Sequence, residues 1–202
     1  MKGKVLSLKE YIKKNNTVML IVISAILMGI IIGAHSAARL APGEAKGIYE
    51  SINRSVYEST AYKAFIKSLQ IEFKSFILLF ICGAAVIGAP AAVFYLGFLG
   101  YALGFSVGFL VKYYGLLGFF AATCAIVPHY LILIPAFISL GVISINFSNK
   151  LLLGERGLKD DFWCYAVKAL LIAAAVFSAC IIEGFFSSFI LKRILSVIIL
   201  KN

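Results

Sequence analysis

The sequence predicts an all-α integral membrane protein: a multi-pass helical bundle of about five spans, with an amphipathic helical segment outside the membrane. Of its 202 residues, 62% are hydrophobic and 14% are charged, and the mean hydropathy is +0.99. Soluble domains are about 45–50% apolar and about 25% charged. Residues 75–111 and 113–149 contain no Asp, Glu, Lys or Arg. Because one span needs about 20 residues, each of these two runs must bend or break.

We expect the first span at 18–38, after a basic head (residues 1–17) in the cytoplasm. Its apolar run is longer than the about 7–15 residues of a signal-peptide core, which favours a retained span. Residues 39–74 form the longest polar segment between spans. Apolar residues recur in it every four positions, which predicts amphipathic helices on the extracytoplasmic face. These positions are Ile48, Ile52 and Val56, then Phe65, Leu69 and Phe73. The Lys and Arg residues of this segment conflict with that side of the membrane, because basic residues favour the cytoplasm.

The rest of the chain completes a single membrane domain, residues 18–202. We expect further spans at 76–96, 97–111 and 116–145, a polar loop at 148–162, and a last span at 166–191. Six spans is the alternative, if residues 113–149 form a tight hairpin. Basic residues after the last span favour a cytoplasmic C-terminus and therefore an even number of spans. The charges of the internal loops favour five spans.

Small residues recur at four-residue spacing along the expected spans. Residues at this spacing share one helix face, where two backbones can approach closely. Such a face serves either internal packing or contact with a partner. The packing and partner candidates are Gly29, Gly33, Gly88, Pro90, Gly100, Gly104 and Gly108.

Four residues inside the apolar runs are candidates for polar chemistry or a broken helix: Pro128, His129, Pro135 and Glu183. Proline removes a backbone donor and kinks or breaks a helix, and broken helices in membranes line cavities or binding sites. Glu183 is the one acidic residue deep inside an expected span, and an ionisable group there is a functional candidate. It either clasps two helices by a hydrogen bond or handles ions or protons, with His129 as the available relay partner.

The sequence predicts neither an enzyme nor a cofactor or metal site. It contains no H-E-x-x-H, G-x-S-x-G or P-loop pattern. Its four cysteines form no C-x-x-C pair, so we expect small buried hydrophobes: Cys82, Cys124, Cys164 and Cys180. The net charge of +10 comes from basic residues that flank spans, an arrangement that indicates lipid headgroups rather than nucleic acid.

Several stretches together resemble the stage II sporulation protein M family, in order and in spacing. They are MGIIIGA from Met28, GAP from Gly88, GYALGFSVGFL from Gly100, the Pro128-His129 to Pro135 segment, and IIEGF from Ile181. Tyr130 and Leu133 stand where the broad family often has Gly and an acidic residue. This departure favours the sporulation branch of the family.

The resemblance implies a non-enzymatic component of the septal and engulfing membrane of the mother cell. Members of this family are needed for endospore engulfment and localise stage II sporulation proteins D and P, which cut septal peptidoglycan. The alternative is a channel or transporter subunit that uses Glu183 and the segment from Pro128 to Pro135. A Glu183 hydrogen-bonded between packed helices would favour the scaffold, whereas a water-lined cavity reaching it would favour transport.

Overall fold

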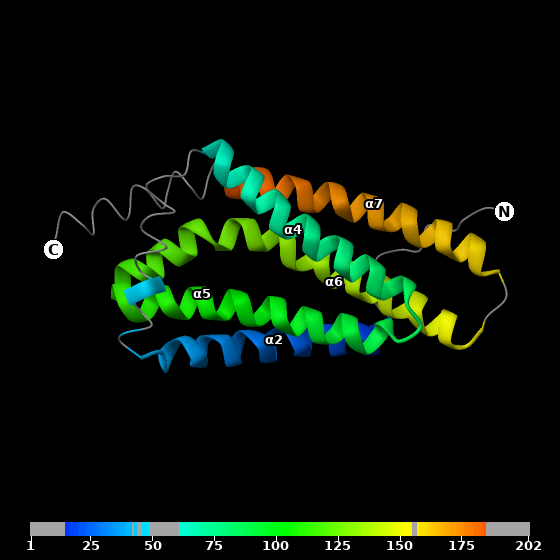
Figure 1. The fold of residues 1–202 in the computed structure, drawn as a ribbon, viewed down its shortest axis with the longest axis horizontal. Coiled ribbons are helices and arrows are strands. Elements are labelled where there is room, and N and C mark those ends of the chain that lie inside the picture. The colour runs from blue at the N-terminus through cyan, green and yellow to red at the C-terminus, as the bar shows by residue number, and fades with distance from the viewer. Residues whose placement is uncertain (1–14, 42, 44–45, 49–60, 155–156, 185–202) are drawn as a thin grey trace.

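A computed structural model describes residues 15–41, 43, 46–48, 61–154 and 157–184. This part of the chain contains five long helices and no strand, which confirms the all-α fold class (Figure 1). The helices are α2 (Asn16–Ala38), α4 (Ala61–Ala84), α5 (Gly88–Ala125), α6 (Val127–Leu152) and α7 (Leu158–Ile182). The basic head up to residue 14, the middle of the polar segment, and the end of the expected last span lie outside the described residues.

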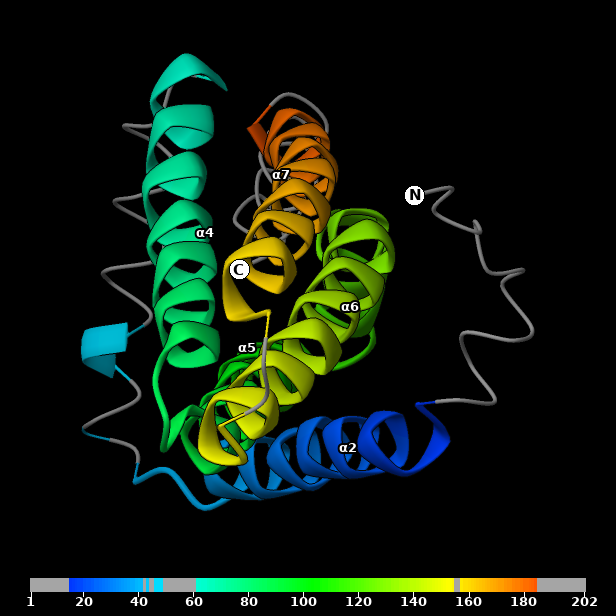
Figure 2. The same cartoon turned by 90° about the vertical axis from the view of Figure 1, so that its right-hand side faces the viewer.

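Helix α6 lies at the centre of the bundle and contacts each of the other four helices. The most extensive contact in the bundle is between α2 and α5. Figures 1 and 2 place α2 on one side of the molecule and α7 on the opposite side, with α5 and α6 between them. Most of the core side chains therefore come from α6 and from the inner faces of its neighbours, such as Leu79, Leu96, Leu140 and Val176.

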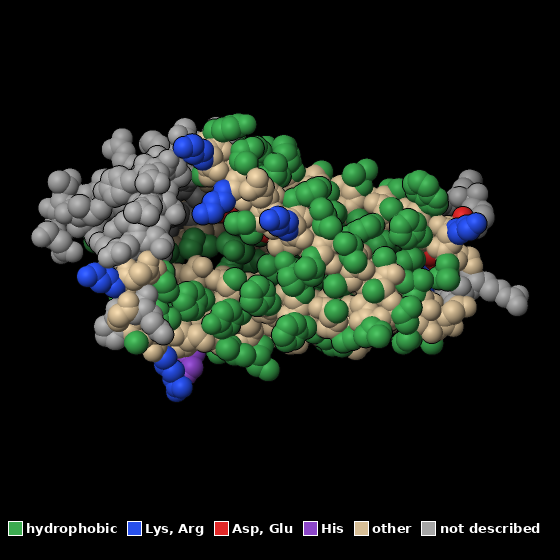
Figure 3. Space-filling view, viewed as in Figure 1, with side chains coloured by type: hydrophobic (Ala, Val, Ile, Leu, Met, Phe, Trp, Pro, Cys, Tyr) green, Lys and Arg blue, Asp and Glu red, His purple; other side chains and the backbone are tan. Residues whose placement is uncertain are grey.

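The outer surface of the bundle is apolar, as expected for a protein surrounded by lipid. Within the described part of the chain, four helices are long and apolar enough to cross a membrane: α2, α5, α6 and α7. Figure 3 shows apolar side chains over most of the visible face, with Lys and Arg near the ends and over the first half of α4. Cys180 is buried, but Cys124 and Cys164 are exposed on this surface, which corrects the burial expected for them.

The first charge-free run breaks earlier than the sequence suggests. Helix α4 begins inside the polar segment and continues to Ala84, and α5 begins at Gly88. The expected boundary at residues 74–76 and the expected span 76–96 are thus corrected. Ser148 of α6 provides hydrogen-bond partners for the backbone at the turn of residues 85–87. Its Oγ donates to the Ala85 carbonyl at 2.8 Å and accepts from the Ala89 N–H at 3.0 Å.

The second charge-free run reverses direction at Gly115, not at Pro128. Gly115 has φ 57° and ψ −135°, a conformation open essentially to glycine alone, and it separates two helical pieces of α5. Figure 1 shows α5 turning back here towards α6. Pro128 lies in the first turn of α6, where a missing N–H costs little, and Pro135 lies within the same continuous helix. The expected spans 97–111 and 116–145 are corrected accordingly. Both ends of the expected polar loop 148–162 are helical, because α6 continues to Leu152 and α7 begins at Leu158.

The predicted small-residue faces of α2 and α5 pack against each other. A Cβ atom added at Gly29 or Gly33 would overlap the carbonyl oxygen of Gly97 or Tyr101, and one added at Gly100 or Gly104 would overlap that of Ile26 or Ile30. Gly108 likewise lies against the backbone of Ala34. These glycines serve contact between two backbones within the chain. Gly88 and Pro90, in contrast, belong to the first turn of α5.

Candidate functional site

Helix α4 carries a stripe of polar side chains that faces the interior of the bundle. Ser68, Glu72 and Ser75 are all at least nine-tenths buried, whereas Phe73 is 48% exposed. Of the apolar positions predicted to face the protein, Phe65 and Leu69 do pack against the core, whereas Phe73 faces outwards. The burial of Ser68, Glu72 and Ser75 fits a membrane protein, in which polar groups within the apolar layer turn towards the bundle interior.

The buried stripe meets two residues that the sequence had singled out. His129 Nε2 lies 3.4 Å from Glu183 Oε2 and 3.8 Å from Glu72 Oε1. Ser68 Oγ donates a hydrogen bond to Glu183 Oε2. The cluster of Glu72, His129 and Glu183, which we call the carboxylate–histidine cluster, therefore joins three helices: α4, α6 and the end of α7.

Each member of the cluster is positioned by its own helix. His129 lies in the first turn of α6 directly after Pro128, and it is 2% exposed. Glu183 follows the last residue of α7 and is half-buried. Glu72 lies in the middle of α4, one turn after Ser68. Since α6 is fixed between the other two helices, the three side chains converge on one point.

A hydrogen bond from its second ring nitrogen, Nδ1, sets the orientation of the His129 ring. Nδ1 lies 3.1 Å from the backbone carbonyl of Ala179. A carbonyl oxygen can only accept, so Nδ1 carries the hydrogen. In the neutral ring, Nε2 then presents a lone pair to the two carboxylates. The second oxygen of Glu72, Oε2, is buried and has no hydrogen-bond partner.

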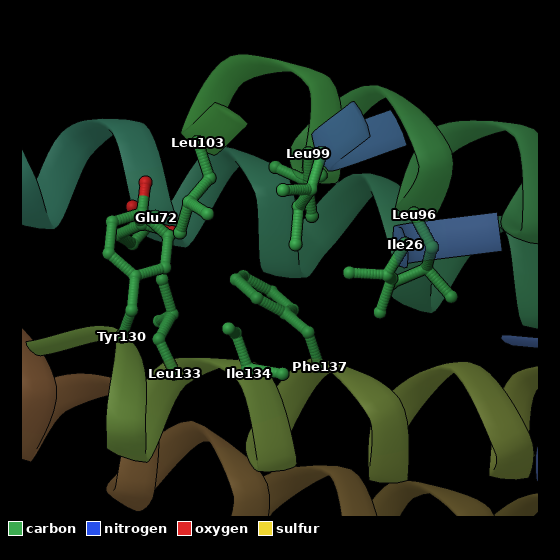
Figure 4. Close-up of a pocket in the computed structure, with 11 residues that line it drawn as sticks. Ile26, Glu72, Leu96, Leu99, Leu103, Tyr130, Leu133, Ile134 and Phe137 are labelled. Carbon is green, nitrogen blue, oxygen red and sulfur yellow. The ribbon is translucent and has the colours of Figure 1, made fainter. Parts of the chain in front are cut away.

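A small cavity lies beside Glu72, between α2, α4, α5 and α6. Its volume is about 30 Å³, which is enough for one or two water molecules. Figure 4 shows Glu72 and Tyr130 at one end of this cavity and apolar side chains, among them Leu99 and Phe137, along the rest. Glu183 is not among the residues that line it.

A comparison with protein families gives one match over this part of the chain. The family model of stage II sporulation protein M matches residues 18–188, which include α4 to α7, all but the first two residues of α2, and the whole cluster. The chain belongs to the stage II sporulation protein M family. No curated protein and no solved structure gave a significant match. Membership of this family makes the chain a sporulation-related membrane protein.

In this member of the stage II sporulation protein M family, the candidate residues separate into two groups. His129 and Glu183 come together in the cluster, and Pro128 directly precedes His129 in sequence. The glycines lie elsewhere, in the contact of α2 with α5 and at the start of α5. Pro135 is exposed on α6.

Sequence reasoning missed Glu72 and Ser68, which it placed in the extracytoplasmic segment. The available signal was the spacing of Ser68, Glu72 and Ser75, which puts polar groups on one face of a helix. The nearby lysines Lys67 and Lys74 oppose this interpretation, because their charges favour a helix exposed to water.

Proposed function

We propose that this chain is a non-enzymatic scaffold in the membrane of an endospore-forming cell. It holds the peptidoglycan-degrading stage II sporulation proteins D and P at the septal and engulfing membrane of the mother cell. Family membership supports a role in sporulation, and the family resemblance supports the engulfment step and these partners.

The observation that carries the proposal is the environment of Glu183. Its carboxylate accepts a hydrogen bond from Ser68 of α4 and lies against His129 of α6. A membrane carboxylate held between packed helices in this way is typical of an internal clasp. The nearby cavity is small, mostly apolar in lining, and does not include Glu183. Together with the backbone contact of α2 and α5, this arrangement favours a rigid body that presents surfaces to other proteins.

The scaffold proposal is tested by co-purification from sporulating cells. The tagged full chain, after crosslinking and mild detergent extraction, should recover at least one of the two peptidoglycan-degrading partners. An unrelated multi-pass protein with the same tag is the control. In cells that lack the chain, a fluorescent partner should leave the septum, and wild-type chain should return it. If the partner is neither recovered nor displaced, the scaffold proposal is wrong.

A second candidate function, a channel or transporter subunit, is favoured by one specific feature: three ionisable side chains meet inside the bundle. In proteoliposomes this function requires a pH-dependent flux that Glu183→Gln abolishes. Asp160→Asn, which changes an exposed carboxylate at the start of α7, is the matched control. A flux no greater than that of empty liposomes would exclude this function.

A further inference from the structure

We propose that the carboxylate–histidine cluster binds one zinc ion, which joins α4, α6 and α7. Three hydrogen-bond acceptors converge in this cluster. Glu72, His129 and Glu183 each offer one ligand atom, and these atoms all lie within 4.8 Å of one another. With the hydrogen of His129 on Nδ1, all three atoms are hydrogen-bond acceptors. Such atoms converge stably only around a shared proton or a metal cation.

The charge of the cluster favours a divalent cation over a proton. Two carboxylates and a neutral imidazole carry a charge of about −2. A single proton leaves one negative charge in an apolar bundle, where an unpaired charge is costly. A divalent ion neutralises the cluster completely. The ion would also give a partner to the Glu72 oxygen Oε2, which is buried and lacks a hydrogen bond, on a residue that is 7% exposed.

The spacing and chemistry of the ligand atoms fit zinc. Zinc bonds of about 2.0–2.2 Å in a tetrahedron place ligand atoms about 3.3–3.6 Å apart. The distances from His129 Nε2 to the two carboxylate oxygens are 3.4 and 3.8 Å, and all three ligand atoms lie within 4.8 Å of one another, so a bound ion would draw them slightly closer together. One imidazole and two carboxylates suit zinc, whereas calcium and magnesium need about six oxygen ligands. Either the second oxygen of Glu72 or a water from the adjacent cavity can complete the site.

The surroundings of the cluster also match those of a metal site. A histidine that binds a metal usually donates its other N–H to a carbonyl or carboxylate, which fixes the ring. His129 does so to the Ala179 carbonyl. A carboxylate ligand is commonly held by a further hydrogen bond, and Ser68 provides one for Glu183.

The test begins with the metal content of the full chain. The protein is purified in mild detergent without a histidine tag or chelator, and its metals are measured by mass spectrometry. We expect about one zinc per chain, with removal by chelator and recovery on addition of zinc chloride. His129→Gln and Glu72→Gln should each lower the content at least tenfold. The matched controls, exposed His35→Gln and Asp160→Asn, should retain wild-type zinc.

The thermal unfolding of the wild-type protein gives a second test, which does not depend on whether the cluster variants fold. Zinc should raise the thermal unfolding midpoint of the chelator-treated wild-type protein by about 5–10 °C at saturating concentration, and magnesium should not. Cobalt in place of zinc should give the visible absorption of a tetrahedral site. A wild-type protein with no zinc and no thermal response would show that protons alone hold the cluster, and the proposal would be wrong. Equal zinc in His129→Gln would also overturn it, because the ion would then lie elsewhere.

Discussion

At the residue scale, the site consists of polar side chains that face the bundle interior, because exposing them to lipid is costly. One charged group at the centre of a bilayer costs about 2.5–3.5 kcal/mol on insertion scales. Glu72 and Glu183 both lie within 3.8 Å of His129 Nε2, so one cation held at this point reduces that cost for both. Ser68 adds a hydrogen bond from the same face of α4. The same rule explains why Phe73, next to Glu72 in sequence, points outwards.

The bond between Ser68 and Glu183 should contribute measurably to stability. We expect Ser68→Ala to lower the free energy of unfolding by about 1 kcal/mol, the usual range for hydrogen bonds between membrane helices. The measurement is denaturant unfolding in detergent. Ser24→Ala is the matched control, because Ser24 bonds only to its own exposed helix. In a double-mutant cycle with Glu183→Ala, strictly additive effects would contradict a direct bond.

At the element scale, two devices hold the helices together. Helices α2 and α5 meet backbone to backbone through glycine faces. Helices α4, α6 and α7 meet through polar groups at two levels: the carboxylate–histidine cluster, and a second cluster around Tyr165. The Tyr165 hydroxyl donates to the Phe80 carbonyl at 2.8 Å and lies 3.0 Å from Ser144 Oγ. The first device needs small side chains, and the second needs matched donors and acceptors.

The glycine contact should not tolerate a bulky residue. Gly104→Ile forces its side chain into the Ile30 backbone, which cannot move without displacing α2. We expect a loss of stability of about 1–3 kcal/mol or more, seen as a lower thermal unfolding midpoint in detergent, together with a defect in engulfment. Ala102→Ile, on the exposed face of the same helix, should leave both unchanged. Normal stability and engulfment in Gly104→Ile would contradict the packing described for α2 and α5.

At the scale of the whole molecule, contacts between distant segments show which helix ends share one side. Lys112 Nζ donates to the carbonyls of Ala38 and Leu40, which lie at the C-terminal end of α2. Asn146 donates to Asn15, just before α2, and Ser148 binds the turn at Ala85. Successive helices therefore run in opposite directions. Helix α4 crosses the bundle as well, although its charged residues exclude it from the four most apolar helices.

This arrangement predicts the membrane topology. Reporter fusions after Leu40 and after Lys112 should report one side of the membrane, and fusions after Ala85 and after Leu153 should report the other. With the N-terminus in the cytoplasm, as we propose, the first pair is extracytoplasmic. If Leu40 and Ala85 report the same side, α4 does not cross and the five-helix topology is wrong. If both pairs are exchanged, the crossings stand and the proposed orientation is inverted.

The sequence by itself determined the class of the protein and its local packing faces. The excess of apolar residues and the charge-free runs predicted a helical membrane bundle, and four-residue spacing predicted the glycine faces, because both depend only on composition and helical periodicity. His129 lies in the second of these runs, and Glu183 is the one acidic residue deep inside the expected last span. Short patterns along the sequence also indicated the family.

Only the tertiary structure decided where the helices turn and which polar groups meet. The apolar turn at residues 85–87 carries no sequence signal of its own, because its polar groups are satisfied by Ser148 from a distant helix. In the sequence, Glu72 lies in a charged segment, which predicts an exposed side chain. In the fold, it lies beside His129 of α6 and Glu183 at the end of α7. The physical reason is the same in both cases. A buried polar group is stable only with its partners, and here those partners lie about 60 or more residues away in the chain.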